Sequence, residues 1–149
     1  MLAAALLAFL HHLAAFLMVA VLVLEWVTFR SEMTTLEARR IQIADMVYGI
    51  CASVVLVVGA LRVMYFEKGW QYYLGNHAFL TKMLLFLIAG LVSIYPTVRF
   101  IKWGKVMENP GMVKIAEREA GRIARCINIE LTCIIGMLLM AALMARGVS

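Results

Sequence analysis

Two adjacent histidines inside the first hydrophobic stretch of the chain are the strongest candidates for chemistry. This stretch, residues 2–27, has the sequence LAAALLAFLHHLAAFLMVAVLVLEWV and contains His11 and His12. A polar side chain inside a membrane is costly and is usually retained for a function. On a helix, His11 shares a face with small residues such as Ala8 and Ala15, which leaves room beside it for another helix or a flat ligand. His12 points about 100° away, so the two histidines cannot bind one metal ion from this helix, and His11 is the preferred candidate.

Other ionisable side chains lie in or near the remaining hydrophobic stretches. Lys82 and Arg62 fall on the same side of the membrane as the N-terminus, where they could hold an anionic group or extend to the lipid headgroups. Glu130 lies on the opposite side, about two turns into its hydrophobic stretch. We expect Lys82 and Glu130 to be catalytic residues. Glu130, Asp45 and Glu25 could carry protons, or they could pair with the arginines that flank these stretches.

The composition indicates an integral membrane protein. Of 149 residues, 64% are hydrophobic and only 15% are charged, and the mean hydropathy is +0.92. Four stretches are about as long as a membrane-spanning helix requires. The expected fold is therefore all-α, an integral membrane four-helix bundle that forms a single domain over residues 1–149. The four predicted spans are residues 2–27, 43–65, 79–98 and 123–145.

The distribution of positive charge predicts the orientation of these spans. Ten of the fourteen Lys and Arg residues lie in the first and third connections, and basic loops remain in the cytoplasm. Both termini should then face the outer, periplasmic side of a bacterial inner membrane. This topology also accounts for the net charge of +5, so we expect no nucleic-acid partner. Cys51, Cys126 and Cys133 form no CxxC pair and are expected to be packing residues.

Three local signals predict where helices begin. Thr34 and Thr35 followed by Glu37 have the spacing of a capping box before the second span. Asn76 could cap the third span. The pair Asn109-Pro110 is typical of a helix start, which predicts that the charged segment after it continues as a helix into the fourth span.

At its predicted depth in the membrane, His11 lies near other candidate residues. It lies about nine residues below the outer edge of its span, a level that the fourth span reaches near Met137 and Met140. Lys82 should lie roughly 9 Å nearer the outer surface. This offset would suit haem b standing on edge, with its iron at His11, Met137 as a candidate second ligand, and its propionates at Lys82 or Arg62. The alternative is that His11 only forms a hydrogen bond to a neighbouring helix.

Several runs of the sequence resemble a known membrane family. AFLHHLAAF, ADMVYGICAS, FEKGWQYYLGN and FLTKMLLFLIAGLVSIYPTVRF are similar to a family of bacterial four-helix membrane proteins of unknown function. The same pattern is distantly similar to HemJ-type protoporphyrinogen IX oxidases and to the CopD copper-resistance group. The resemblance matches a first-helix histidine to His11, a Tyr-Gly pair to Tyr48, a third-helix lysine to Lys82 and an Asn-Glu pair loosely to Asn128 and Glu130.

The resemblance implies a function for these positions. It implies that His11 is the metal ligand of haem b, that Lys82 matters for activity, and that Tyr48 belongs to the cofactor site. The chain departs from the oxidases at Leu80 and at Phe29-Arg30, where they carry further histidines. The leading hypothesis is a haem b membrane protein with a redox role, either oxidase-like or in electron transfer, with a porphyrin or quinone as partner. The alternative is a cofactor-free accessory or scaffold subunit with a basic cytoplasmic loop. A homo-oligomer is compatible with both hypotheses.

Overall fold

Four long helices dominate the computed structural model, which describes residues 1–66, 70–104 and 111–147. Each of the four is long and apolar enough to cross a membrane, so the prediction of an all-α membrane bundle is confirmed. In chain order the elements are α1 (Leu2–Thr28), β1 (Glu32–Thr34), α2 (Thr35–Leu61), the π-helical turn η1 (Arg62–Phe66), α3 (Trp70–Leu74), α4 (His77–Trp103), β2 (Met112–Lys114) and α5 (Glu117–Ala145).

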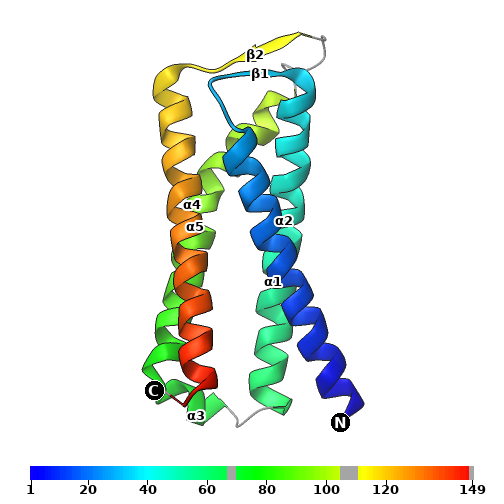
Figure 1. The fold of residues 1–149 in the computed structure, drawn as a ribbon, viewed down its shortest axis with the longest axis vertical. Helices are drawn as coiled ribbons and strands as arrows, with labels where there is room; N and C mark the ends of the chain where they lie inside the picture. Colours follow the sequence, from blue (N-terminus) through cyan, green and yellow to red (C-terminus); the bar gives the residue numbers. More distant parts are fainter. Residues whose placement is uncertain (67–69, 105–110, 148–149) are drawn as a thin grey trace.

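The helices pack as two pairs, α1 with α2 and α4 with α5 (Figure 1). The two pairs meet closely near the strands and separate toward the opposite end, where α1 begins and α5 finishes. We call the first end the strand end and the second the terminal end. Both chain termini lie at the terminal end, as four crossings require. Which side of the membrane this end faces stays a prediction from the charge distribution.

A two-stranded antiparallel ribbon closes the strand end (Figure 1). Met33 pairs with Val113, and both side chains are buried beneath the ribbon. On the outer face Glu32 pairs with Lys114, and their side chains form a salt bridge of 3.1 Å. The expected helix after Pro110 is therefore wrong over residues 112–114, which form a strand because they pair with β1. Asn109 and Pro110 themselves lie outside the described residues.

The predicted helix starts of α2 and α4 are confirmed. The Thr34 side chain accepts a hydrogen bond from the Glu37 backbone N–H at 3.2 Å, and the Glu37 carboxylate accepts one from the Thr34 N–H at 2.8 Å. This capping box starts α2 eight residues before the predicted span of 43–65. Asn76 caps α4 by accepting a hydrogen bond from the Phe79 N–H at 2.9 Å. Both caps satisfy backbone donors that have no partner within the helix.

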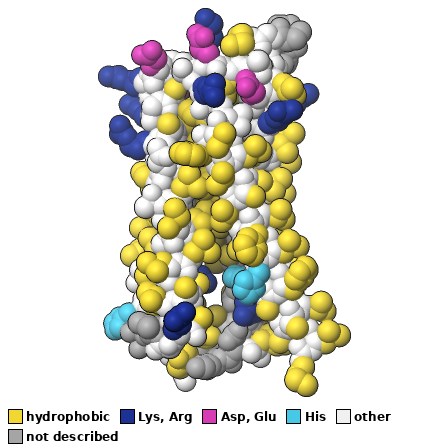
Figure 2. All heavy atoms as spheres, viewed as in Figure 1, with side chains coloured by type: hydrophobic (Ala, Val, Ile, Leu, Met, Phe, Trp, Pro, Cys, Tyr) yellow, Lys and Arg dark blue, Asp and Glu magenta, His cyan; other side chains and the backbone are white. Residues whose placement is uncertain are grey.

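The aromatic part of the core lies at the strand end. The rings of Phe100 and Trp103 are 4.8 Å apart, and Phe29 stacks on Trp103 at 6.2 Å. Hydrophobic side chains cover the middle of the molecule, whereas the Asp and Glu side chains visible on the same face lie at the strand end (Figure 2). Such an apolar surface suits contact with lipid. Tight packing at the strand end and separation at the terminal end leave space between the helices.

Candidate functional site

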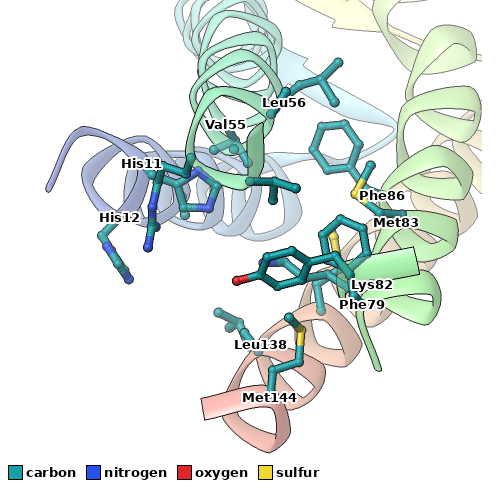
Figure 3. A pocket seen from close by; sticks show the side chains of 18 of the residues that line it. His11, His12, Val55, Leu56, Phe79, Lys82, Met83, Phe86, Leu138 and Met144 are labelled. Atoms are coloured by element: carbon teal, nitrogen blue, oxygen red, sulfur yellow. The ribbon is translucent and has the colours of Figure 1, made fainter. Parts of the chain in front are cut away.

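A cavity of about 470 Å³ lies between the helices toward the terminal end. All four long helices contribute to its lining, and η1 and α3 complete it. Most of the lining is apolar, and a volume of 300–1,000 Å³ with a few polar groups is typical of a site for a small molecule or cofactor. Apolar lining residues include Val55, Leu56, Phe79, Phe86 and Leu138 (Figure 3).

His11, the preferred candidate from the sequence, lines this cavity from α1. The ring is half-buried, and its Nδ1–Cε1 edge faces α2 at Gly59, where a β carbon would lie 3.2 Å from Cε1 and 3.6 Å from Nδ1. With any other residue at position 59, the imidazole would have to move away from the helix by a few tenths of an ångström. The Val55 carbonyl is near enough to interact with the ring, but Nδ1 is buried without a completed hydrogen bond. Since this edge faces α2, Nε2 is the nitrogen left to face a ligand.

His12 behaves differently from His11. Its Nδ1 lies 2.6 Å from the Ala8 carbonyl oxygen of the same helix and can donate a hydrogen bond to it. The two imidazole rings are 6.0 Å apart and nearly perpendicular. His12 is exposed at the margin of the cavity, and its ring points away from that of His11 (Figure 3). The structure therefore confirms that the two rings diverge.

Two basic side chains line the cavity near His11. Lys82 comes from the first turns of α4, and Arg62 begins the π-helical turn that follows α2. Both interact electrostatically with His11 and with each other. Lys82 is half-buried and forms no salt bridge with another described residue. The Lys82 ammonium group in a largely apolar cavity favours an anionic ligand.

Thioether side chains lie on the other walls of the cavity. Met137, which is 7% exposed, and Met144 approach from α5, and Met83 approaches from α4. Met140, which the depth estimate placed level with Met137, is not among the lining residues. The structure thus keeps Met137 as the candidate second ligand, and it adds Met144 and Met83, which the sequence analysis did not single out. Isolated methionines in an apolar chain carry no pattern that would have marked them.

The remaining predicted site residues lie elsewhere. Tyr48 and Glu130 do not line the cavity that contains His11 and Lys82. They lie close to each other, near Glu25 and Asp45. The structure therefore divides the predicted site in two. His11, Lys82, Arg62 and Met137 share the cavity, and Tyr48 and Glu130 belong to a separate buried cluster of polar side chains.

No bare metal centre is indicated in the described ranges. Over residues 1–66, 70–104 and 111–147, no three His, Cys, Asp or Glu side chains are grouped so that they could hold a metal ion. A haem iron needs fewer protein ligands, because one or two ligands from side chains are sufficient.

The fold and the cavity define a multi-pass integral membrane protein whose four helices surround a largely apolar internal site. The chain belongs to the family described as "Predicted membrane protein (DUF2214)", whose model matches residues 3–149. No curated protein and no solved structure matches the chain. The distant similarity to the oxidases and the copper-resistance group stays a prediction.

Proposed function

We propose that this protein binds haem b in the cavity through His11 and has a redox role in the membrane. The observation that carries the proposal is the His11 imidazole, which has one edge against Gly59 and its Nε2 left for a ligand in an apolar cavity. Imidazole nitrogen is a common axial ligand of haem iron. A helical bundle core is also a usual place for such a cofactor.

The lining residues fit the chemistry of haem. The macrocycle is flat and apolar, and the walls that surround it would be aliphatic and aromatic side chains such as Val55, Leu56 and Phe86. Haem b also carries two carboxylates, and Lys82 and Arg62 supply positive charge within the same cavity. A ligand with an apolar body and an anionic edge, such as haem b, therefore matches both the apolar and the basic residues of the lining.

Each residue has a defined task in this arrangement. Gly59 allows the imidazole to lie against α2, and the nearby Val55 carbonyl can orient the ring through Nδ1, as backbone carbonyls do for ligating histidines. Lys82 and Arg62 would neutralise the carboxylates. Met137 could supply a second ligand, and Trp70 and Tyr73 would add aromatic contacts to the macrocycle. Haem, when bound, supplies a one-electron redox centre.

A visible spectrum of the purified protein tests this proposal. We expect protein expressed with added haem precursor to show a Soret band, and the His11→Ala variant to lose most of it. His12→Ala is the matched control, because His12 lies next to His11 but bonds to its own helix. Colourless wild-type protein, or equal loss in both variants, would overturn the assignment of His11.

The basic side chains can be tested by haem affinity. Lys82→Gln should retain the spectrum but weaken binding about tenfold or more, because a hydrogen bond to a charged group contributes about 1.5–3 kcal/mol. Lys114→Gln, which removes an exposed charge at the strand end, should leave the affinity unchanged. Equal affinities for wild type and Lys82→Gln would remove Lys82 from the proposed site.

The redox reaction in which the bound haem takes part, oxidase-like or electron transfer, is also part of this proposal. Oxidation of a porphyrinogen by the haem-loaded protein would support the oxidase-like role. Oxidation of a quinol would support electron transfer with a membrane quinone. Purification of a colourless protein with a stoichiometric partner would instead favour the accessory or scaffold role.

A further inference from the structure

A second polar region lies inside the bundle, between the cavity and the strand end. Its members are three buried carboxyl side chains from three helices: Glu25 of α1 and Glu130 of α5, each 2% exposed, and Asp45 of α2, 8% exposed. Glu25 interacts electrostatically with both other carboxyl groups, and Glu130 interacts with Asp45. The fold therefore places three buried acidic groups within electrostatic range of one another, although they are not grouped closely enough to hold a metal ion.

The hydrogen bonds in this cluster are incomplete. Thr97 of α4 donates a hydrogen bond to Asp45 Oδ1 at 2.8 Å, and the Tyr48 hydroxyl lies within hydrogen-bonding reach of the Glu130 carboxyl group. One oxygen of each glutamate, Glu25 Oε1 and Glu130 Oε1, is buried without any partner. A buried oxygen without a donor carries a desolvation cost that a bound proton or water would relieve.

Basic side chains do not neutralise the cluster. The sequence left open whether these acids pair with flanking arginines, but no salt bridge joins Glu25, Asp45 or Glu130 to a Lys or Arg in the described part of the chain. The other titratable groups that interact with Glu130 are Tyr48 and the thiols of Cys126 and Cys133. None of these is a cation, so three ionised carboxylates would repel one another in a medium that cannot screen them.

A groove of about 250 Å³ leads from this cluster along α2 and α4. At one end it is lined by Tyr48 and Thr97, the side chains that contact Glu130 and Asp45. Ser53 and Ser93 also line it, and their hydroxyls donate hydrogen bonds to the Gly49 and Gly90 carbonyls of their own helices. At the other end it reaches side chains that also line the His11 cavity, namely Met18, Leu56, Phe86 and Met137. The Tyr48 and Thr97 side chains therefore place the polar cluster at the edge of this groove.

We propose that Glu25, Asp45 and Glu130, together with Tyr48, form an exchangeable proton-binding site inside the membrane. Protons bind to the carboxylate oxygens and leave from them, and no electron transfer is involved. The site does not require haem, so its test can succeed or fail independently of the proposed function.

Infrared spectroscopy of the haem-free protein in lipid nanodiscs measures the protonation directly. We expect a C=O stretching band from protonated carboxyl groups at neutral pH, a shift of this band in D2O, and its loss as the pH is raised. The exchange in D2O shows that the protons are accessible. Absence of the band at neutral pH, or a band that does not respond to D2O, would overturn the proposal.

Conservative variants assign the band to the cluster. Glu130→Gln and Glu25→Gln should each remove part of its intensity with little loss of thermal stability, because glutamine resembles the protonated acid in shape and charge. Tyr48→Phe should shift the band by removing a hydrogen bond without removing a carboxyl group. Glu32→Gln, at the exposed salt bridge with Lys114, is the control and should change nothing. An unchanged band in both buried glutamate variants would refute the assignment.

A cation site is the competing explanation, and the same spectra distinguish it. If the carboxylates bind a monovalent or divalent cation, adding sodium or calcium salt at constant pH and ionic strength should replace the C=O band by carboxylate bands. A proton site predicts no such change. Salt-dependent loss of the band would therefore overturn the proposal.

Discussion

Gly59 and His11 lie so close that a β carbon on residue 59 would stand 3.2 Å from the imidazole Cε1. Few real β carbons approach another atom this closely, so a side chain at position 59 must displace the ring. This contact fixes the edge of His11 that faces α2 and, with it, the nitrogen that remains for the cavity. The position of the imidazole thus depends on Gly59, which lies on another helix and has no side chain.

The first prediction follows from this contact. Gly59→Leu should push the imidazole away from α2 and cause a loss of haem absorbance similar to that of His11→Ala, whereas Gly59→Ala should weaken it in part. Gly49→Ala is the control, because a β carbon at Gly49 of the same helix meets no atom within 4 Å. The ratio of Soret absorbance to protein absorbance measures the effect. Full haem content in Gly59→Leu would show that His11 does not need this position.

A second glycine sets the distance between α4 and α5. A β carbon at Gly136 would lie 2.9 Å from Leu85 Cδ1, the end of a half-buried side chain that can move aside, so Gly136→Ala should destabilise the protein by about 1 kcal/mol, the lower end of the range for overpacking. The double variant Gly136→Ala with Leu85→Ala should recover part of this loss, because the obstructing side chain is removed. Thermal denaturation in one detergent measures all three proteins. Absence of rescue would mean that the two residues do not share this contact in solution.

The helices of this fold were predictable from the sequence because each depends on local signals. Four long apolar stretches are sufficient to predict four spans, since a chain in lipid must satisfy its own backbone hydrogen bonds. The capping side chains of Thr34 and Asn76 act on N–H groups only three residues away. Local hydrogen bonding of this kind is visible in a sequence motif.

The strand ribbon was not predictable in the same way. Met33 and Val113 are eighty residues apart in the chain and pair only because the two helix pairs bring them together. Strands of three residues provide too short a pattern to recognise. The helix start expected at Asn109-Pro110 was reasonable as a local signal, but pairing with β1 determines the conformation of the residues that follow.

The part of the candidate site that depends on depth in the membrane was predictable from the sequence. Counting residues along straight helices placed Met137 level with His11, and the structure brings both into one cavity with Lys82. Rotation of the helices about their axes was not predictable from one sequence. That rotation directs Tyr48 and Glu130 into a separate cluster, and it places Gly59 rather than a larger residue against the imidazole.

The capping box of α2 supplies a third prediction. Thr34→Ala removes the side-chain oxygen that accepts the Glu37 N–H and should cost about 1 kcal/mol of stability, the usual value for an N-cap. Thr34→Ser keeps the acceptor and should be close to wild type. Denaturation by a gradient of SDS in mixed micelles measures the difference. Equal stability of the alanine and serine variants would show that the cap does not contribute.

The orientation of the bundle is the fourth prediction, and it decides which compartment the two ends contact. The strand end should face the cytoplasm, because most of the basic residues lie in the connections that meet there. In a background without Cys51, Cys126 and Cys133, a cysteine at exposed Ser31 of the strand end should react with a membrane-impermeant maleimide only after the cells are permeabilised. A cysteine at exposed Ala145, at the end of α5, should react in intact spheroplasts. The reverse pattern would place the terminal end on the cytoplasmic side. Lys82 and Arg62 lie toward that end, so the same result would move the proposed anionic edge of the ligand to the cytoplasmic leaflet and require its reaction partner to come from there.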